Sequence, residues 1–273
     1  MGDDPVEVEI KLLVAREDLG RVLSAQAVQR RASGRVQAAD LVSIYCDTPQ
    51  LDLHAEGLAL RLRQSGARWL QTLKSGAASA AGLTQREEYE WPVAGRRIDL
   101  GLLETTPYAP VFAKRRVRET LRPVFTTRFS RRLRRLALAD GTLAELCVDE
   151  GEIRAGRSRR QISEVEIELK AGNRQALFEF AAELLVEVPF RLGTDSKAER
   201  GYALYRNEQP RPRKASSFSL RPDMPRAMVL QTVAHACLAQ IHANEHGFLT
   251  GRDPEFLHQL RVGFRRLRVA LAM

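Results

Sequence analysis

The sequence of 273 residues lacks the features that mark several common protein classes. Its three cysteines, Cys46, Cys147 and Cys237, are far apart and form no CxxC pair, so we expect no disulfide framework. No apolar run approaches the roughly 20 residues that a membrane span needs. The N-terminus lacks the basic and apolar regions of a signal peptide, which predicts a soluble, cytoplasmic protein. The glycine-rich loops of P-loop and Rossmann nucleotide sites are also absent.

Charge is distributed unevenly along the chain. The formal net charge is +9 and the sequence pI is about 9.9, which favours polyanionic partners. From Arg211 onward there are ten basic and four acidic residues, a net charge of +6, which leaves +3 for the longer first part. The first part therefore carries both signs of charge, as a site for metal and phosphate requires, whereas the last part is simply basic.

Residues 6–12 alternate strictly between apolar and charged side chains. In a β-strand this pattern places Glu7, Glu9 and Lys11 on one face and the aliphatic side chains on the other. Two glutamates on one face repel each other, and a bound divalent cation would turn that repulsion into chelation. Taken alone, the stretch is more simply a surface strand whose charges are solvated.

The same alternation recurs in later stretches, each of which places charged side chains on one face. These side chains are Arg61 and Arg63, then Lys74, then Arg86, Glu88 and Glu90, and finally Glu164, Glu166 and Glu168. So many strands with one charged and one apolar face predict a closed antiparallel β-barrel in an α+β fold. Its apolar face would pack outward against flanking helices, and its charged face would line a wet lumen.

The motifs in this part of the chain resemble, in type and order, those of the CYTH superfamily, the triphosphate tunnel metalloenzymes. They are Glu7-x-Glu9-x-Lys11, Tyr45-Cys46-Asp47-Thr48-Pro49, Leu60-Arg61-Leu62-Arg63, Gln71-Thr72-Leu73-Lys74, Val148-Asp149-Glu150-Gly151 and Ser-Lys-Ala-Glu-Arg-Gly-Tyr at 196–202. The ordered set is specific and covers about the first three quarters of the chain, although its first motif alone is weak. The resemblance implies a metal-dependent inorganic triphosphatase that releases diphosphate and phosphate.

The resemblance also implies roles for single residues. Seven cations would bind the phosphate chain, and the three lysines among them would act in catalysis: Lys11, Arg61, Arg63, Lys74, Arg86, Arg131 and Lys197. The metal ligands would be Glu7, Glu9, Glu166 and Glu168, whose oxygens suit Mg²⁺ or Mn²⁺. Glu88, Glu90, Asp149 and Glu164 would support these residues or contact the metal themselves. Asp149 is equally well explained as a turn residue before Gly151.

We expect a tunnel domain at residues 1–206, a proline-containing linker at 207–223 and two helices at 224–273. The last helix, which starts at Pro254, resembles the opening of a CHAD domain and is expected to belong to an incomplete module. The resemblance rests on His258, Arg261, Arg265 and Arg268, the last three of which share one helical face. It implies binding of polyphosphate or another polyanion, and a solvated basic face is the alternative.

Periodicity and breaking residues predict the elements between these motifs. In the first half we expect a helix over 16–32, a strand over 40–47, a hairpin over 58–64 and 68–74, a loop over 75–82 and a strand over 83–93. In the second half we expect weak helices over 95–120, strands over 122–138, 143–149 and 162–170, and helices over 173–187 and 225–246.

Other functions fit the same residues. An adenylate cyclase, or a thiamine or nucleoside triphosphatase of the same superfamily, would use the same lumen, and a non-catalytic polyphosphate-binding module would keep the charges without turnover. Neither nucleic acid nor a membrane is expected as a partner. His235, His242 and His246 lie at i, i+7 and i+11 of one predicted helix, which also fits a zinc site, although ordinary hydrogen-bonded or exposed histidines are commoner.

Overall fold

The computed structural model describes residues 6–76, 78–80, 83–251 and 253–272, and the chain divides into two compact units after Asn207. Among the described helices, none combines the length and the apolar composition that crossing a lipid bilayer requires.

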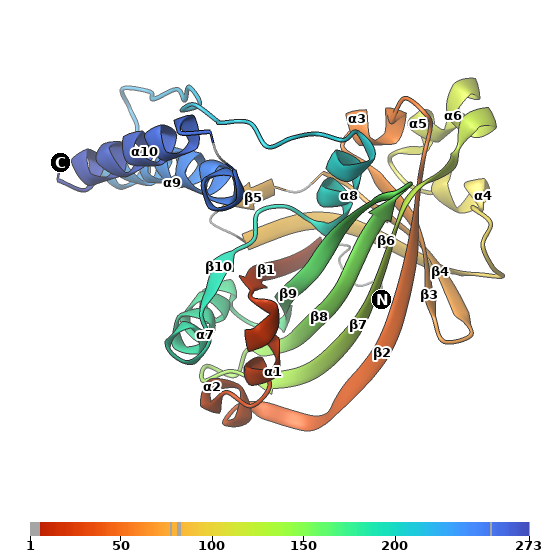
Figure 1. Ribbon diagram of the computed structural model, residues 1–273, viewed down its shortest axis with the longest axis horizontal. Helices are drawn as coiled ribbons and strands as arrows, with labels where there is room; N and C mark the ends of the chain where they lie inside the picture. Colours follow the sequence, from red (N-terminus) through yellow and green to blue (C-terminus); the bar gives the residue numbers. More distant parts are fainter. Residues whose placement is uncertain (1–5, 77, 81–82, 252, 273) are drawn as a thin grey trace. The chain divides into compact units, whose positions relative to one another are not determined.

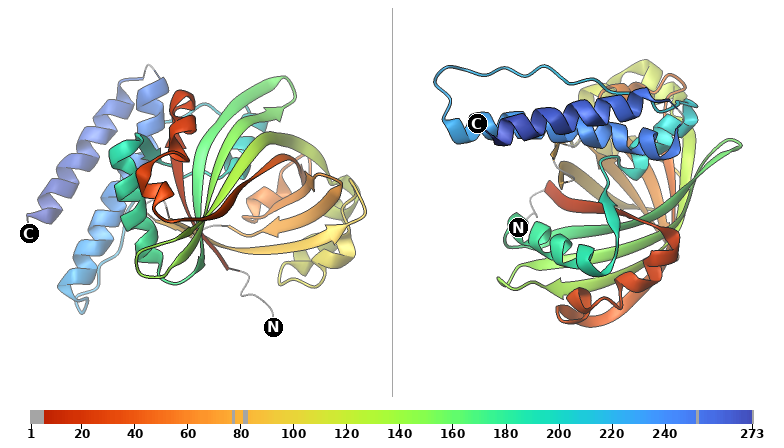
Figure 2. Two further views of the ribbon diagram at one scale, coloured as in Figure 1. Left: turned by 90° about the horizontal axis from the view of Figure 1, so that it is seen from below. Right: turned by 60° about the vertical axis from the view of Figure 1, so that its left-hand side comes forward.

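The first unit is built on one antiparallel sheet (Figure 1). Its strands are β1 Val6–Val14, β2 Ala32–Asp47, β3 Ala59–Ser65, β4 Arg68–Lys74, β5 Ala78–Ala80, β6 Leu83–Val93, β7 Arg122–Ala137, β8 Leu143–Ala155, β9 Ser158–Ala171 and β10 Phe190–Leu192. Eight of them follow the order β1-β9-β8-β7-β2-β3-β4-β6, and β6 pairs back with β1. The sheet therefore closes into a ring, as Figure 2 shows, which confirms the predicted barrel.

Short helices flank the ring, and one longer helix, α7, packs against it. The helical segments of this unit are η1 Arg16–Asp18, α1 Leu19–Val22, α2 Gln26–Gln29, α3 Asp52–Ala55, α4 Leu100–Leu103, α5 Ala109–Ala113, α6 Arg115–Thr120, α7 Arg174–Glu187 and α8 Lys197–Tyr205. Buried side chains of these helices belong to three separate hydrophobic clusters rather than one.

The outward face of β1, β8 and β9 is apolar, as the alternation predicts. Ile10 and Leu12 of β1 are fully buried there, together with Leu177 and Phe180 of α7. Burying such a side chain stabilises the fold by about 1.5–3 kcal/mol each. The apolar stripe of these strands therefore anchors helices on the outside and leaves the charged stripe facing inward.

The inward face of β7 and β8 departs from the prediction of a uniformly charged lumen. Phe125, Phe129 and Ile153 form a buried cluster there, and Tyr202 of α8 packs into it. A Cβ atom on Gly201 would lie 2.1 Å from the Phe125 ring, so α8 approaches this face as closely as a glycine permits. One part of the ring interior is thus filled by a helix instead of water.

Three predicted elements differ from the structure. Residues 16–32 do not form one helix, because the chain becomes extended at Ala25 and α2 starts afresh after it. β2 begins at Ala32, well before residue 40, and pairs there with β7. The predicted loop over 75–82 contains the short strand β5, and its residues 77, 81 and 82 lie outside the described part of the chain.

The second unit contains two packed helices, α9 Arg226–Thr250 and α10 Glu255–Leu271. Cys237 and Ile241 of α9 are buried with Phe256 and Leu260 of α10. Part of the predicted linker is fastened to this unit, because the Arg213 backbone N–H donates to Asn244 and the Asn244 amide donates back to the Arg213 carbonyl.

The three histidines of α9 do not form a metal cluster. Across the described residues, the only group of three or more His, Cys, Asp or Glu side chains that converge closely is an acidic one in the first unit. His235 is exposed on α9, and Cys237 is a free, fully buried cysteine.

Candidate functional site

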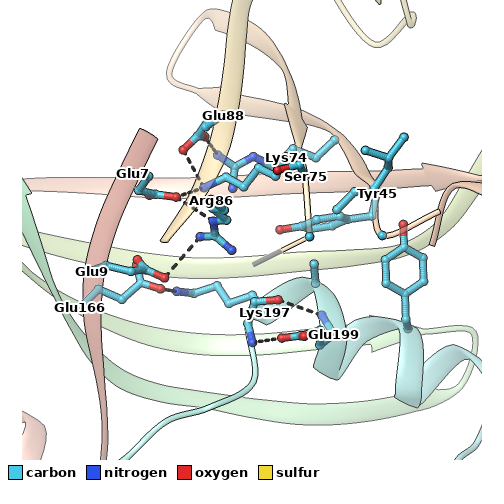
Figure 3. Close-up of a pocket in the computed structure, with 18 of the residues that line it drawn as sticks. Glu7, Glu9, Tyr45, Lys74, Ser75, Arg86, Glu88, Glu166, Lys197 and Glu199 are labelled. Atoms are coloured by element: carbon cyan, nitrogen blue, oxygen red, sulfur yellow. Dashed lines mark hydrogen bonds and ion pairs between the residues drawn. The ribbon is translucent and has the colours of Figure 1, made fainter. Parts of the chain in front are cut away.

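A cavity of about 380 Å³ lies inside the ring and is lined mostly by charged side chains (Figure 3). Its acidic side chains are Glu7, Glu9, Glu88, Glu90, Glu166, Glu168 and Glu199, and its basic side chains are Lys11, Arg61, Arg63, Lys74, Arg86, Arg131 and Lys197. All seven predicted phosphate-binding cations and all four predicted metal ligands therefore line one space. Because seven acidic groups face seven basic ones, a bound phosphate chain would bring an excess of negative charge.

Strand register explains how residues far apart in sequence meet here. Residues that lie opposite each other in an antiparallel pair project from the same face of the sheet. Glu9 lies opposite Glu168, and Lys11 lies opposite Glu166. On the other side of the ring, Lys74 of β4 lies opposite Glu88 of β6. The pairing of neighbouring strands thus places the charged side chains of all these strands on the inward face of the ring.

Glu7 holds two cations of neighbouring strands. Its Oε2 atom accepts from Lys74 Nζ and Arg86 Nε, both at 2.8 Å. Burial would raise the pKa of Glu7, but the charges of Lys74 and Arg86 outweigh it and hold this pKa well below its usual range. Arg86 also reaches Glu9 Oε1 at 3.3 Å, which links the two glutamates of β1 through one guanidinium.

Arg61 and Arg63 use only some of their guanidinium donors in bonds to the described residues. Arg61 is 5% exposed, and its Nε atom has no hydrogen-bond partner among the described residues. Arg63 donates to Ser43 Oγ at 3.3 Å and makes no ion pair with any described carboxylate. Its burial and the neighbouring Arg61 and Arg131 lower the pKa of Arg63 to about 10. Unused guanidinium donors inside a cavity are suited to bind an anion.

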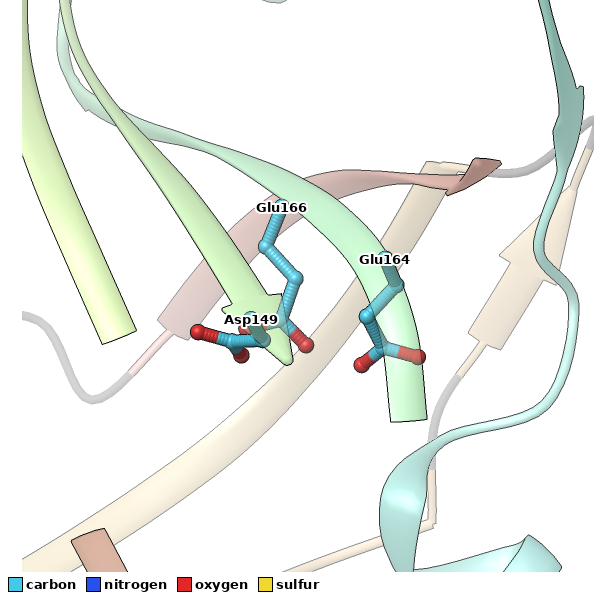
Figure 4. Close-up of side chains that lie close together, drawn as sticks. All are labelled: Asp149, Glu164 and Glu166. Carbon is cyan, nitrogen blue, oxygen red and sulfur yellow. The ribbon is translucent and has the colours of Figure 1, made fainter. Parts of the chain in front are cut away.

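Asp149, Glu164 and Glu166 form a tight acidic cluster, shown in Figure 4, in which one carboxylate oxygen of each residue lies within 4.8 Å of the other two. Lys197 Nζ lies 2.7 Å from Asp149 Oδ2, 2.5 Å from Glu164 Oε1 and 2.9 Å from Glu166 Oε1. The ammonium group therefore occupies the place that a metal would take in this cluster.

Two arginines complete this buried network. Arg131 Nη2 lies 2.6 Å from Asp149 and 2.5 Å from Glu166, and Arg200 pairs with Glu164. Burial would raise the pKa of Glu166, but Lys197, Arg131 and Lys11 hold it well below its usual range. Asp149 lies within β8, so its interpretation as a turn residue is wrong.

The remaining carboxylates have the chemistry of a hard-cation site. Glu7, Glu9 and Glu168 offer only oxygen atoms, which Mg²⁺ and Mn²⁺ prefer, and β1 and β9 place Glu9 beside Glu168. These three groups do not converge as closely as the cluster around Lys197, since Glu7 and Glu9 are bonded to lysine and arginine. These three carboxylates suit a divalent cation that displaces the lysine and arginine side chains now paired with Glu7 and Glu9.

Several lining residues had no predicted role. Tyr45, His54 and Tyr202 also line the cavity, and His54 of α3 stacks on Tyr202 of α8 with ring centroids 4.2 Å apart. Burial would raise the pKa of Tyr45, but Arg61, Arg63 and Lys74 outweigh it and lower this pKa. Tyr45 belongs to a motif that the sequence displays, and it lies opposite Arg61, so the β2–β3 register would have identified it.

The four residues predicted to bind polyphosphate belong to the second unit and are not among the residues that line this cavity. His258, Arg261, Arg265 and Arg268 are exposed on α10. Gln259, Leu260 and Gly263 of the same helix are buried, so the basic residues occupy its solvent-facing side.

Comparison with known proteins adds the following. Residues 6–202 match the CYTH domain family, and residues 232–273 match the CHAD domain family. An inorganic triphosphatase from Haemophilus influenzae is 30% identical over 203 residues, which cover 72% of this chain and 54% of that protein. The chain thus spans about half the length of this curated relative.

A solved structure from Hippeastrum, described as a candidate adenylyl cyclase with a dominant triphosphatase activity, is similar in fold. Its TM-score is 0.52 at 21% sequence identity, and the match covers 76% of this chain and 98% of that chain.

Proposed function

The chain belongs to the CYTH family, and from that premise we propose that it hydrolyses inorganic triphosphate to diphosphate and phosphate. The similarity to an inorganic triphosphatase from Haemophilus influenzae supports this substrate over others of the family. The observation that carries the proposal is the pair Arg61 and Arg63, which both line the cavity. Arg61 Nε has no hydrogen-bond partner among the described residues, and Arg63 makes no ion pair with a described carboxylate.

A phosphate chain in the cavity would first take the donors of Arg61 and Arg63. Lys74, Arg86 and Lys11 would contact it further along, after exchange of their carboxylate partners for phosphate oxygens. Arg131 and Lys197 would hold one end of the chain while they stay anchored to buried carboxylates. Positioning and charge neutralisation of this kind supply most of the rate enhancement in phosphoryl transfer.

Glu7, Glu9 and Glu168 would hold Mg²⁺ or Mn²⁺, and Glu166 would join them if Lys197 releases it. When bound, the ion would polarise the terminal phosphoryl group and lower the pKa of a coordinated water. Glu88 would keep Arg61 and Lys74 in place, and Asp149 and Glu164 would do the same for Lys197 at the opposite side.

The second unit would bind a polyphosphate or another polyanion through His258, Arg261, Arg265 and Arg268. Exposure of these residues on one side of α10 supports the proposal. The domain limits, a tunnel domain to residue 206 followed by a linker to 223, are part of the same proposal.

The test is phosphate release from four substrates by the whole chain, with Mg²⁺ and with a chelator. Tripolyphosphate, ATP, thiamine triphosphate and long-chain polyphosphate are compared at equal concentration. Rapid metal-dependent release from tripolyphosphate alone supports the proposal. Cyclic AMP from ATP, faster release from thiamine triphosphate, or binding without release would each assign the cavity to another function.

A further inference from the structure

Most cations of the cavity are already neutralised by carboxylates of the same cavity. Lys74 lies 2.8 Å from Glu7 and 2.7 Å from Glu88, and Arg86 lies 2.8 Å from Glu7. On the opposite side, Glu166 holds Arg131 and Lys197. Of the seven lining cations, Arg63 is the one that makes no ion pair with a described carboxylate. The groups proposed for phosphate and the groups proposed for metal are thus bonded to each other.

We propose that the phosphate chain and divalent cations bind this cavity cooperatively, and that Glu7 carries most of the coupling. The inference rests on the proposed function, because it assumes that triphosphate enters this cavity. Its physical basis is that each ligand must break ion pairs between a cation and a carboxylate of the cavity. The phosphate chain takes the cation and frees the carboxylate, which the metal needs, and the metal does the converse.

Phosphate oxygens that take both Lys74 and Arg86 leave Glu7 without a counter-ion. The Glu7 side chain is only 13% exposed, so its unpaired charge would be poorly hydrated. A divalent cation alone would meet the converse difficulty, since capture of Glu7 would leave Lys74 only Glu88 and would leave Arg86 only its longer contact with Glu9. When both ligands are present, every charge regains a partner, and each ligand therefore raises the affinity for the other by the same factor.

Glu7 is the strongest candidate because one of its oxygens serves two cations on two different strands. Glu88 has a similar place, since it pairs with Arg61 at 3.1 Å and with Lys74 at 2.7 Å. Glu90 lines the same cavity but accepts only from Thr72 Oγ1, at 3.2 Å, and makes no ion pair with a described cation. Replacing Glu90 therefore removes the same charge from the cavity without releasing a lysine or arginine.

The experiment measures tripolyphosphate binding to the whole chain by calorimetry in a chelating, metal-free buffer. Glu7→Gln is expected to bind tripolyphosphate about 10-fold more tightly than the wild type, because Lys74 and Arg86 have each already lost one carboxylate partner. Glu90→Gln should change the affinity less than about 3-fold, because it removes a negative charge that is not paired with a lysine or arginine of the cavity. Glu88→Gln should shift the affinity in the same direction as Glu7→Gln and serves as the test if Glu7→Gln does not fold.

A second arm uses an imido-bridged triphosphate, which resists cleavage, with and without Mg²⁺. Mg²⁺ should tighten binding to the wild type about 10-fold or more and should tighten binding to Glu7→Gln much less. Equal metal-free affinity of wild type, Glu7→Gln and Glu88→Gln would overturn the coupling, and wild-type hydrolysis of tripolyphosphate would then leave the proposed function standing. Absence of both binding and hydrolysis would overturn the two together.

Discussion

Two halves of the inward face of the β-ring differ in the side chains that cover them. On the side of β1, β3, β4 and β6, the inward side chains are lysine, arginine and glutamate around a cavity. On the side of β7 and β8, they include Phe125, Phe129 and Ile153, against which α8 packs. Lys197, at the start of α8, stands where the halves meet and bonds to three carboxylates. The comparison teaches that alternation fixes which side chains point inward, while a docked helix decides which of them meet water.

The largest expected effect comes from breaking the buried ion network at the junction of the halves. Glu166→Gln removes the carboxylate that binds Arg131 and Lys197. Loss of one partner from a buried pair costs about 3–5 kcal/mol of unfolding free energy. Urea denaturation at pH 7 measures the loss. Glu150→Gln, whose partner Arg16 is 67% exposed, is the matched surface control and should change stability by less than about 1 kcal/mol.

The same variant predicts a pH dependence. The folded-state pKa of Glu166 lies well below its usual range, because Lys197, Arg131 and Lys11 outweigh the effect of burial. Its stabilisation is therefore fully present above the unfolded pKa of about 4.3 and is lost as the pH falls through the lower folded value. The stability gap between wild type and Glu166→Gln should accordingly shrink below about pH 4.3. A gap that grows on acidification would contradict the assigned direction.

A change confined to the charged half should affect activity without affecting stability. Arg63→Ala removes a guanidinium that pairs with no described carboxylate, so no buried anion is left alone. We expect kcat/KM for tripolyphosphate to fall about 100-fold or more, as for loss of a donor that binds developing charge. Steady-state kinetics and a thermal melt measure the two quantities. Arg128→Ala, at an exposed position of β7, is the control and should keep wild-type kinetics.

The smallest expected effect comes from a change in the apolar half of the inward surface. Gly201→Ala would place a methyl group 2.1 Å from the Phe125 ring, so α8 must shift. Overpacking of this kind costs about 1–3 kcal/mol of stability, and a shifted α8 would move Lys197 and lower kcat. Gly20→Ala, where an added Cβ meets nothing within 4 Å, should be neutral in both assays. Unchanged stability and kcat for Gly201→Ala would show that this contact does not fix Lys197.

Strand alternation predicted which side chains line the cavity, because that depends on local parity. The recurrence of one charged face over many strands predicted that the sheet closes. The same rule could not predict the apolar half. Phe125 and Phe129 alternate like any other strand residues, and only the docking of α8 decides that their side is dry. Strand parity also could not predict that Lys197 lies among Asp149, Glu164 and Glu166. That contact joins the first turn of α8 to strands β8 and β9.

The failed helix over 16–32 has a similar cause. Glu187, at the end of α7, accepts from the backbone N–H groups of Gln26 and Ala27 and so caps the start of α2. A cap supplied by a residue some 160 positions away leaves no trace in the local sequence. In the second unit, the pairing of Asn244 with the Arg213 backbone likewise fastens residues that composition alone marked as a linker.

Closure of the ring through β1 has a consequence for synthesis of the protein. β1 ends at Val14, but its partner β9 starts only at Ser158. At a translation rate of about 5–20 residues per second, roughly 7–30 seconds pass before the ribosome has made that partner. During this time the first strand has an unpaired edge and an apolar face that α7 does not yet cover. The nascent chain therefore needs protection from aggregation at β1 until β9 and α7 have been made.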